Sequence, residues 1–246
     1  MIIREYMSGR RAYSLVRQSM PPSSRITFEE FAILCHLANS EERLCTSQIA
    51  EYQGVLRPTM THRTAHLARM GFIERASSPT DRRSVYCLLT EAGSRAVEEI
   101  IKTMCASIKV PMPLSRCDAP RLCRIIDAMG SVSLSASDLV LAALDLWERG
   151  EAGIEGLRLG ERIQGREAEG GIKGLSVGDI VAALGLLQPT VSMALSTLID
   201  QGSVQRVAAR EARTSLVVLS ESGRVRAHEL LRIIDSIHVR NARRSR

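Results

Sequence analysis

A cluster of side chains suited to nucleic-acid contact follows Arg57 and shares one face of a predicted helix. Pro58 suits the first turn of a helix, where its missing N–H leaves no hydrogen bond unmade. Residues 60, 64 and 67 recur at helical spacing and mark the buried face. The opposite face carries donors and cations that suit base edges and phosphates, namely Thr59, His62, Arg63 and His66. The alternative for that face is an ordinary solvated helix surface.

A basic turn follows this helix. Gly71 is typical of a helix C-terminus, and residues 72–76 and 85–89 have the composition of two short strands. The turn between them carries Asp81, Arg82 and Arg83. We interpret Asp81 as a residue that orients a neighbouring Arg, rather than as a catalytic acid. Thr90 then predicts the cap of another helix.

This order of helix, hairpin with a basic tip, and helix resembles the MarR family of bacterial transcription regulators. The family pattern is a Pro-Thr-x-Thr helix start, a Gly-hydrophobic-hydrophobic-x-Arg strand, an Asp-x-Arg wing and a Leu-Thr-x-x-Gly exit, and residues 58–93 match it throughout. The resemblance implies a winged helix-turn-helix fold, with the recognition helix in the major groove and a wing Arg along the minor groove. The DNA-binding residues that it implies in this stretch are Arg57, Thr59, Thr61, His62, Arg63, His66, Asp81, Arg82 and Arg83.

The pattern occurs a second time. Residues 188–192 match 57–61 at an offset of 131, and residues 220–223 match 90–93 at an offset of 130, as a one-residue deletion in the second wing would give. We therefore predict a mainly α protein with small β-hairpin wings (an α+β fold). It contains two tandem winged helix-turn-helix domains, residues 1–132 and 133–246, with flanking dimerisation-type helices. The DNA-binding residues predicted for the second copy are Thr190, Ser192, Met193, Thr197, Arg210 and Arg213.

The two copies differ on the outward face of the recognition helix. The counterparts of the four first-copy residues are Thr190, Met193, Ala194 and Thr197, and no Lys or Arg lies between residues 188 and 202. We therefore expect the first copy to do most of the base reading. A glycine-rich insertion at 150–174 lies within the second copy, after its first helix, and is either a lid or partner-binding loop, or a solvated connection. Its glycine spacing matches no phosphate-binding loop.

Other patterns predict the helices that must hold these side chains. Residues 1–20 have a helical pattern, and the resemblance implies that they join the C-terminal helices in a dimer interface. Thr27, with Glu30 three residues later, has the spacing of a capping box. Thr46 opens the short helix that leads into the recognition helix. Residues 91–107, 115–129 and 135–148 are periodic and predict three more helices.

The composition is that of an ordinary globular protein and favours an anionic partner. Apolar residues make up 45% and charged residues 24% of the chain, the net charge is +6 and the pI is about 9.3. Aromatic residues, at 3%, are too few for the base-stacking platforms of single-strand binders. No apolar run reaches the roughly 18 residues of a membrane span and no signal-peptide core is present, so we expect a cytoplasmic protein. The absence of an interpretable catalytic or metal-ligand spacing predicts that the chain is not an enzyme and uses no metal or cofactor.

Three functions are consistent with these patterns. The first is regulation of transcription by sequence-specific binding to double-stranded DNA at a pseudo-palindromic operator. One chain would act there as a pseudo-dimer, or two chains as a homodimer, and the resemblance implies a phenolic or lipophilic effector. The second is a protein-interaction module that uses the winged-helix surfaces. The third is a thiol-based redox-sensing regulator, which the resemblance implies because some MarR relatives sense peroxides through a low-pKa cysteine. All six cysteines lie in the first half of the chain: Cys35, Cys45, Cys87, Cys105, Cys117 and Cys123. Reduced thiols in apolar positions are the simpler interpretation of these cysteines.

Overall fold

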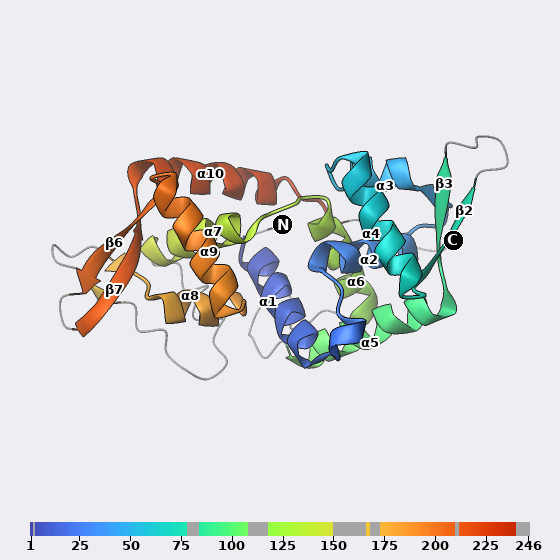
Figure 1. The fold of residues 1–246 in the computed structure, drawn as a ribbon, viewed down its shortest axis with the longest axis horizontal. Helices are drawn as coiled ribbons and strands as arrows, with labels where there is room; N and C mark the ends of the chain where they lie inside the picture. The colour runs from blue at the N-terminus through green and yellow to red at the C-terminus, as the bar shows by residue number, and fades with distance from the viewer. Residues whose placement is uncertain are drawn as a thin grey trace. The chain divides into compact units, whose positions relative to one another are not determined.

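The computed structural model of the chain describes residues 1, 3–77, 84–107, 118–149, 166–167, 173–209 and 212–239 (Figure 1). Contacts divide these residues into two compact units. We call residues 15–107, 118–133 and 237–239 the N-terminal unit, and residues 1–14 with the described part of 134–236 the C-terminal unit. The units depart from the predicted limits of 1–132 and 133–246 mainly in residues 1–14, the first part of helix α1 (Ile3–Ser19), which group with the C-terminal unit.

The N-terminal unit is a set of helices with a small antiparallel sheet, as predicted. After a short 3-10 helix (Pro22–Ser24), its elements are α2 (Phe28–Ala38), β1 (Leu44–Cys45), α3 (Thr46–Tyr52), α4 (Arg57–Arg69), β2 (Ile73–Ser77), β3 (Val85–Leu89), α5 (Glu91–Ser107) and α6 (Ala119–Gly130). The strand order is β1-β3-β2, and Ile73 pairs with Leu89. Helix α6 starts at Ala119 rather than at the predicted Ser115, because the Asp118 side chain caps it by accepting a hydrogen bond from the Arg121 N–H.

Local signals explain where the helices of this unit begin. The Thr27 hydroxyl accepts from the Glu30 N–H, and the Glu30 carboxylate accepts from the Thr27 N–H at 2.8 Å, which confirms the predicted capping box. Pro58 occupies the first turn of α4. Fully buried apolar side chains then join the helices, among them Phe31, Ile49 and Leu67. This packing fixes α4 against α2 and α3.

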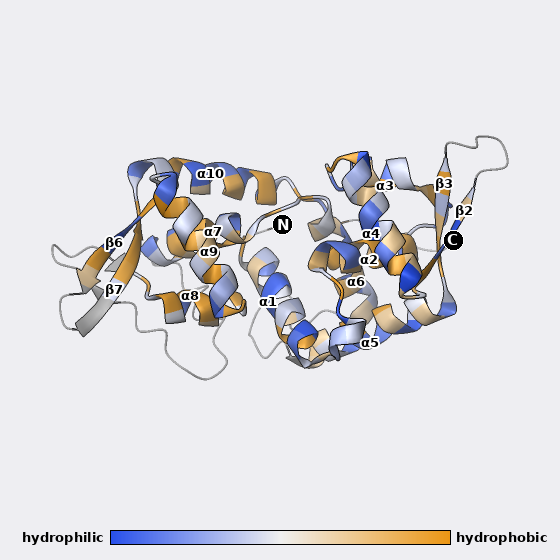
Figure 2. Ribbon diagram, in the orientation of Figure 1, coloured by the Kyte–Doolittle hydropathy of each residue, from blue (hydrophilic) through white to orange (hydrophobic). Residues whose placement is uncertain are grey.

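Beyond the first part of α1, the elements of the C-terminal unit follow a similar order, with two short strands between the first two helices. They are α7 (Ala136–Glu148), β4 (Arg166–Glu167), β5 (Lys173–Gly174), α8 (Val177–Leu184), α9 (Gln188–Asp200), β6 (Val204–Ala209), β7 (Ala212–Leu219) and α10 (Glu221–Asp235). Strands β6 and β7 form an antiparallel hairpin, and the part of β7 nearest α10 is hydrophobic (Figure 2) and buried from Leu216 to Leu219. The short β4–β5 pair is the described part of the glycine-rich insertion.

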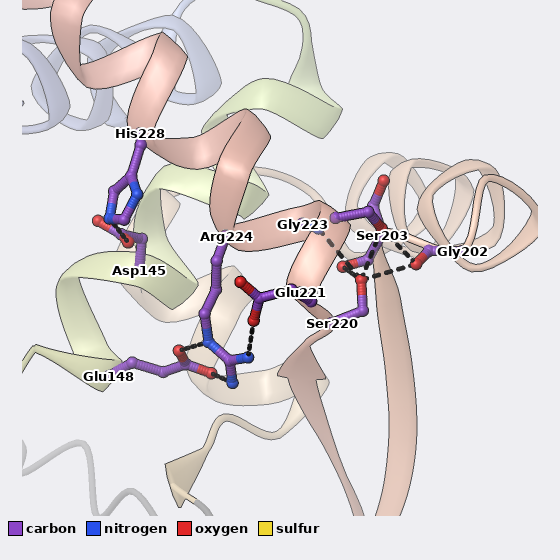
Figure 3. Close-up of polar contacts among 10 residues, drawn as sticks. Asp145, Glu148, Gly202, Ser203, Ser220, Glu221, Gly223, Arg224 and His228 are labelled. Carbon is purple, nitrogen blue, oxygen red and sulfur yellow. Dashed lines mark hydrogen bonds and ion pairs between the residues drawn. The ribbon is translucent and has the colours of Figure 1, made fainter.

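One junction has the same geometry in both units. Where the hairpin leads into the next helix, the Thr90 hydroxyl donates to the Gly71 and Phe72 carbonyls in the N-terminal unit. The Ser220 hydroxyl donates to the Gly202 and Ser203 carbonyls in the C-terminal unit (Figure 3). Gly71 and Gly202 both have positive φ, at 74° and 66°, which favours glycine. The residues matched by the sequence offset at this junction therefore make the same hydrogen bonds in both units.

A close backbone approach completes this junction. A Cβ atom on Gly93 would collide with the Phe72 carbonyl oxygen, and one on Gly223 would collide with the Ser203 carbonyl oxygen. The N–H of each glycine also donates a hydrogen bond to the capping hydroxyl, Gly93 to Thr90 and Gly223 to Ser220. Glycine is therefore required where α5 and α10 begin.

Candidate nucleic-acid interface

Helix α4 divides into a buried and an exposed face as its sequence predicts. Met60, Thr64 and Leu67 are fully buried, and their packing turns the opposite face outward. The exposed predicted DNA-binding residues on α4 are Arg57, Thr59, Thr61 and His62. Their side chains are accessible to a nucleic acid, and their donors suit phosphates and base edges.

Two predicted DNA-binding residues of α4 are only half-exposed, because they bond to neighbouring helices. The Arg63 Nη1 donates to the Gln53 Oε1 at 2.8 Å. The His66 Nδ1 lies 2.7 Å from the Glu30 Oε1. The sequence places these two residues on the outward face, whereas the structure shows them at its edge with partners from α2 and the end of α3.

Gln53 and Glu30 are the residues that sequence reasoning missed at this site. Gln53 is 2% exposed, and its Nε2 donates to the Glu29 carbonyl of α2 at 3.0 Å. Glu30 is 4% exposed, and its second oxygen accepts from the Thr27 N–H. The sequence identifies Glu30 only as a capping residue. It gives no indication that Gln53 contacts α4, because a polar residue at a helix end is usually solvated.

The wing tip lies outside the described residues, and so do the predicted contacts Asp81, Arg82 and Arg83. Strand β2, which leads toward the tip, is exposed from Glu74 to Ser77. Arg75 on this strand is therefore an exposed cation beside the predicted interface, and in the sequence it is the Arg of the family's strand pattern.

Helix α9 presents a different surface from α4. Thr190 and Thr197 are exposed and Ser192 is half-buried, while Met193 is 73% exposed. Ala194 is buried, so its predicted outward position is wrong: it belongs to the face that packs on α7. Arg210 and the Arg213 side chain lie outside the described part of the wing.

The apolar character of this surface extends to the start of α9. Leu187, the N-cap residue, is 56% exposed, and α9 carries no cation along its length. Asp200 at its end is exposed and negative. This surface offers fewer favourable contacts to a phosphate backbone than α4 does.

Ionic contacts in the C-terminal unit join α7 to α10 instead (Figure 3). Arg224 bonds to Glu148 at 2.9 Å, and His228 lies 3.7 Å from Asp145. Burial raises the pKa of Asp145, although Arg149 and His228 oppose this. Outside the view, Arg226 bonds to Asp138 at 3.1 Å. These contacts hold α10, the helix that follows the wing, against α7.

A buried polar cluster joins α2 and α6 in the N-terminal unit. His36 Nδ1 lies 2.9 Å from the Asp127 Oδ1, and its ring stacks on Tyr52 with centroids 3.9 Å apart. Asn39 donates to the other Asp127 oxygen at 3.1 Å. The cluster holds the two helices together. Among the described residues, no set of three His, Cys, Asp or Glu side chains is placed to hold a metal ion.

The thiols fall into distinct environments. Burial raises the pKa of Cys35 far above its usual value, whereas a hydrogen bond from Cys35 lowers the pKa of Cys123. Burial also raises the pKa of Cys87 and of Cys105. At Cys45, partial burial is outweighed by hydrogen bonds from Ser47 and from backbone N–H groups at the start of α3, which lower its pKa. Cys117 lies outside the described residues.

One cavity of about 460 Å³ lies within the N-terminal unit. Its lining comes from α2, the end of β3, α5 and the start of α6, and includes Leu37, Asn39, Leu89, Val97, Ile101 and Cys123. The volume is in the range of small-molecule sites, which is about 300–1,000 Å³.

Among the described residues, no single helix is long and apolar enough to cross a membrane; α8 and α9 reach that composition only together, across a bend of 117°.

Solved structures with similarity to this chain include two regulators. The transcriptional regulator PA4135 shares 29% identity over 32% of this chain and 57% of its own, with a TM-score of 0.30. This chain thus spans little more than half of that protein. BpsR of Bordetella bronchiseptica, whose DNA binding is regulated by 6-hydroxynicotinic acid, shares 23% identity over 44% of this chain and 81% of its own, with a TM-score of 0.34.

Sequence comparison is more informative. A model of the MarR family matches residues 26–85, which include α2, α3, α4 and β2. The helix-turn-helix-type transcriptional regulators Mb0904 of Mycobacterium bovis and MT0903.1 of Mycobacterium tuberculosis are each 31% identical to this chain over 124 residues, 50% of this chain and 79% of theirs. The family model covers α4, and the sequence match covers most of each mycobacterial relative. This chain therefore belongs to the MarR family of DNA-binding transcription regulators.

Proposed function

We propose that this chain regulates transcription by sequence-specific binding to double-stranded DNA through two tandem winged helix-turn-helix domains, one built around α4 and the other around α9. The observation that carries the proposal is the repeated junction of Thr90 with Gly71 and of Ser220 with Gly202. It supports a duplication of the whole helix–hairpin–helix unit, with domain limits near residues 132 and 133.

The N-terminal unit is the principal reader of sequence in this proposal. Thr59, Thr61, His62 and Arg63 face the major groove from α4, and Arg57 contacts a phosphate. Arg82 and Arg83 at the wing tip lie along the minor groove, and Asp81 orients one of them. In the C-terminal unit, Thr190, Ser192 and Thr197 on α9 and Arg210 and Arg213 in the wing hold the DNA mainly through its backbone.

The operator is pseudo-palindromic in this proposal, with half-sites about 34–36 Å apart, as in two-fold pairs of such units. One chain supplies both halves as a pseudo-dimer. Mass photometry of the complex with a single operator duplex distinguishes one bound chain from the two of a homodimer.

An effector site is proposed for the cavity between α2, α5 and α6. Its lining is mainly aliphatic, with Asn39, Ser94 and Glu98 as polar groups. Because the described residues of the lining include no Lys or Arg, a neutral and largely apolar ligand suits the cavity better than an anion. The test is a screen of neutral and anionic aromatic compounds for release of the operator.

The proposal is tested by selecting bound sequences from a pool of random duplexes, followed by gel shifts at two salt concentrations. We expect one enriched motif and an affinity that falls with salt, by roughly −0.9 in log–log slope per phosphate contact. Enrichment of no motif would refute sequence-specific binding.

The second candidate function is a protein-interaction role for the C-terminal unit. Leu187 and Met193 favour it, because exposed apolar side chains on a recognition helix suit a protein partner better than phosphates. In that case, changing both residues to Ser would leave DNA affinity intact and abolish recovery of a partner from the native host.

A further inference from the structure

Two buried polar residues beside α4 contact the side chains expected to read DNA. Gln53 ends α3 and uses both ends of its side chain amide: Nε2 donates to the Glu29 carbonyl of α2, and Oε1 accepts from Arg63 of α4. Gln53 therefore connects α2 to α4 through one side chain that is 2% exposed.

The hydrogen bond that Arg63 donates to Gln53 restricts the Arg63 side chain in the absence of DNA. A guanidinium has five N–H donors in a planar fork, and Nη1 is held at 2.8 Å from Gln53. The other donors of the same rigid group are then directed as well. A long Arg side chain normally loses much rotamer freedom on binding, and a side chain held in advance loses less.

Glu30 holds His66 in the same way, one helical turn further along α4. Its carboxylate is buried, with one oxygen on the Thr27 N–H and the other 2.7 Å from the His66 Nδ1. A buried carboxylate requires such partners, so this contact is costly to break. The bond fixes the orientation of the imidazole and leaves Nε2 for another partner.

The C-terminal unit lacks both contacts. At the positions of Gln53, Arg63 and His66 it has Leu184, Ala194 and Thr197, the first two of which are buried. Asp138, the counterpart of Glu30 in the capping box of α7, bonds to Arg226 of α10 instead. Folding of this type of unit therefore does not require a polar link to the recognition helix, which points to a functional reason for the link in the N-terminal unit.

We propose that Gln53 and Glu30 are positioning residues for DNA recognition: Gln53 presets Arg63, and Glu30 presets His66, for contact with the major groove. The inference rests on the proposed function of α4 as the reading helix. It goes beyond that function because neither positioning residue touches DNA. Their effect on DNA binding passes only through the residue that each one holds.

A double-mutant cycle tests this dependence. Gln53→Met keeps the length of the side chain while removing both hydrogen-bonding groups. We expect it to lower affinity for the enriched sequence about tenfold, as for the loss of one hydrogen bond to a charged group. On an Arg63→Ala background the same change should have no further effect on affinity. Gln53→Glu retains an acceptor for Arg63 and should restore most of the affinity.

A further readout and matched variants separate this proposal from a structural role. Affinity for an unrelated duplex should stay within about twofold in Gln53→Met, because phosphate contacts remain. Gln205→Leu, an exposed change in the C-terminal unit, is the control for altered surface. If Gln53→Met fails to fold, the cycle is run with Gln53→Leu, which copies Leu184. Glu30→Gln, which keeps the capping bond, is paired with His66→Ala in the same design.

The outcomes are distinguishable. If the Gln53 change weakens specific binding equally with and without Arg63, Gln53 is structural and the positioning proposal is wrong, while the proposed function stands. If Arg63→Ala itself leaves specific binding unchanged in a folded protein, Arg63 is not a reader, and its assigned role and the proposal fail together. Coupling between Gln53 and Arg63, with rescue by Glu, supports the proposal.

Discussion

Glu30 and Asp138 occupy the same place in the two units, but they bond to different helices. Each lies at the third position of its helix and completes a capping box. Glu30 then reaches His66 on the recognition helix at 2.7 Å, whereas Asp138 accepts from Arg226 on α10 at 3.1 Å. The capping box depends only on neighbouring residues and is present in both units. The residue that the carboxylate meets on another helix differs between the units. The carboxylate at the same capping position thus bonds to a different helix in each unit.

The same contrast extends over the rest of both units. In the N-terminal unit, Gln53 adds a second polar link to α4 through Arg63. In the C-terminal unit, ionic contacts gather between α7 and α10 instead, as between Glu148 and Arg224 (Figure 3). The N-terminal unit thus has two polar links to α4, the helix predicted to face the DNA groove, besides the cluster that joins α2 and α6. The C-terminal unit has its links on the helix after the wing, which agrees with unequal reading by the two halves.

The largest expected effect concerns the junction that the two units share. Gly93→Ala and Gly223→Ala should each destabilise the protein by about 1–3 kcal/mol or more, because the new Cβ would collide with a backbone carbonyl oxygen. The measurement is chemical unfolding. Gly178→Ala in α8 is the control, since its Cβ meets only Ser176 Oγ at 3.7 Å. A penalty at only one of the two junctions would break the equivalence of the units.

The second prediction concerns base reading. Arg63→Ala should remove roughly 1–3 kcal/mol of discrimination at one base pair of the operator, as for the loss of a forked Arg contact. Met193→Ala should leave discrimination unchanged, because a thioether offers no such donor. A base-by-base operator scan measures both. Equal losses in the two variants would show that the units read DNA equally.

The third prediction separates the two capping carboxylates. Asp138→Asn should lower the free energy of unfolding by about 0.5–1 kcal/mol, because the pair with Arg226 is partly exposed, and should leave operator affinity unchanged. Glu30→Gln should lower operator affinity through His66. Unfolding and anisotropy titrations on the same samples measure the two effects. An affinity loss in Asp138→Asn matching that in Glu30→Gln would contradict the comparison.

The smallest effect concerns the thiols, all of which lie in the first half of the chain. Cys45 and Cys105 are both half-exposed, but the pKa of Cys45 is lowered and that of Cys105 is raised. The thiolate is the reactive form, so Cys45 should be alkylated faster near neutral pH. The advantage should shrink as pH rises above both pKa values. Peptide mass spectrometry at several pH values measures it, with Cys45→Ser as the control. A faster Cys105 at neutral pH would contradict the assignment.

The sequence by itself determined the features that depend on neighbours along the chain. Thr27 with Glu30 predicted a capping box, Pro58 a helix start, and Met60, Thr64 and Leu67 a buried face, and the structure has all of them. These signals act within about one helical turn or a tight turn, so a linear pattern contains them. The second occurrence of the pattern also predicted a helix from residue 188, a hairpin and a helix from about residue 220, and α9, β6, β7 and α10 lie there.

Only the tertiary structure decided which distant side chains bond to one another. Arg63 and His66 looked like outward residues of one helix, yet their partners come from 10 and 36 positions away in the chain. Ala194 looked outward and is buried, and residues 1–14 group with elements far along the sequence. Helical periodicity predicts the direction of a side chain only to within part of a helical turn. Which neighbour meets a side chain at the edge of a face depends on how α2, α3 and α4 pack, and no local pattern encodes that packing.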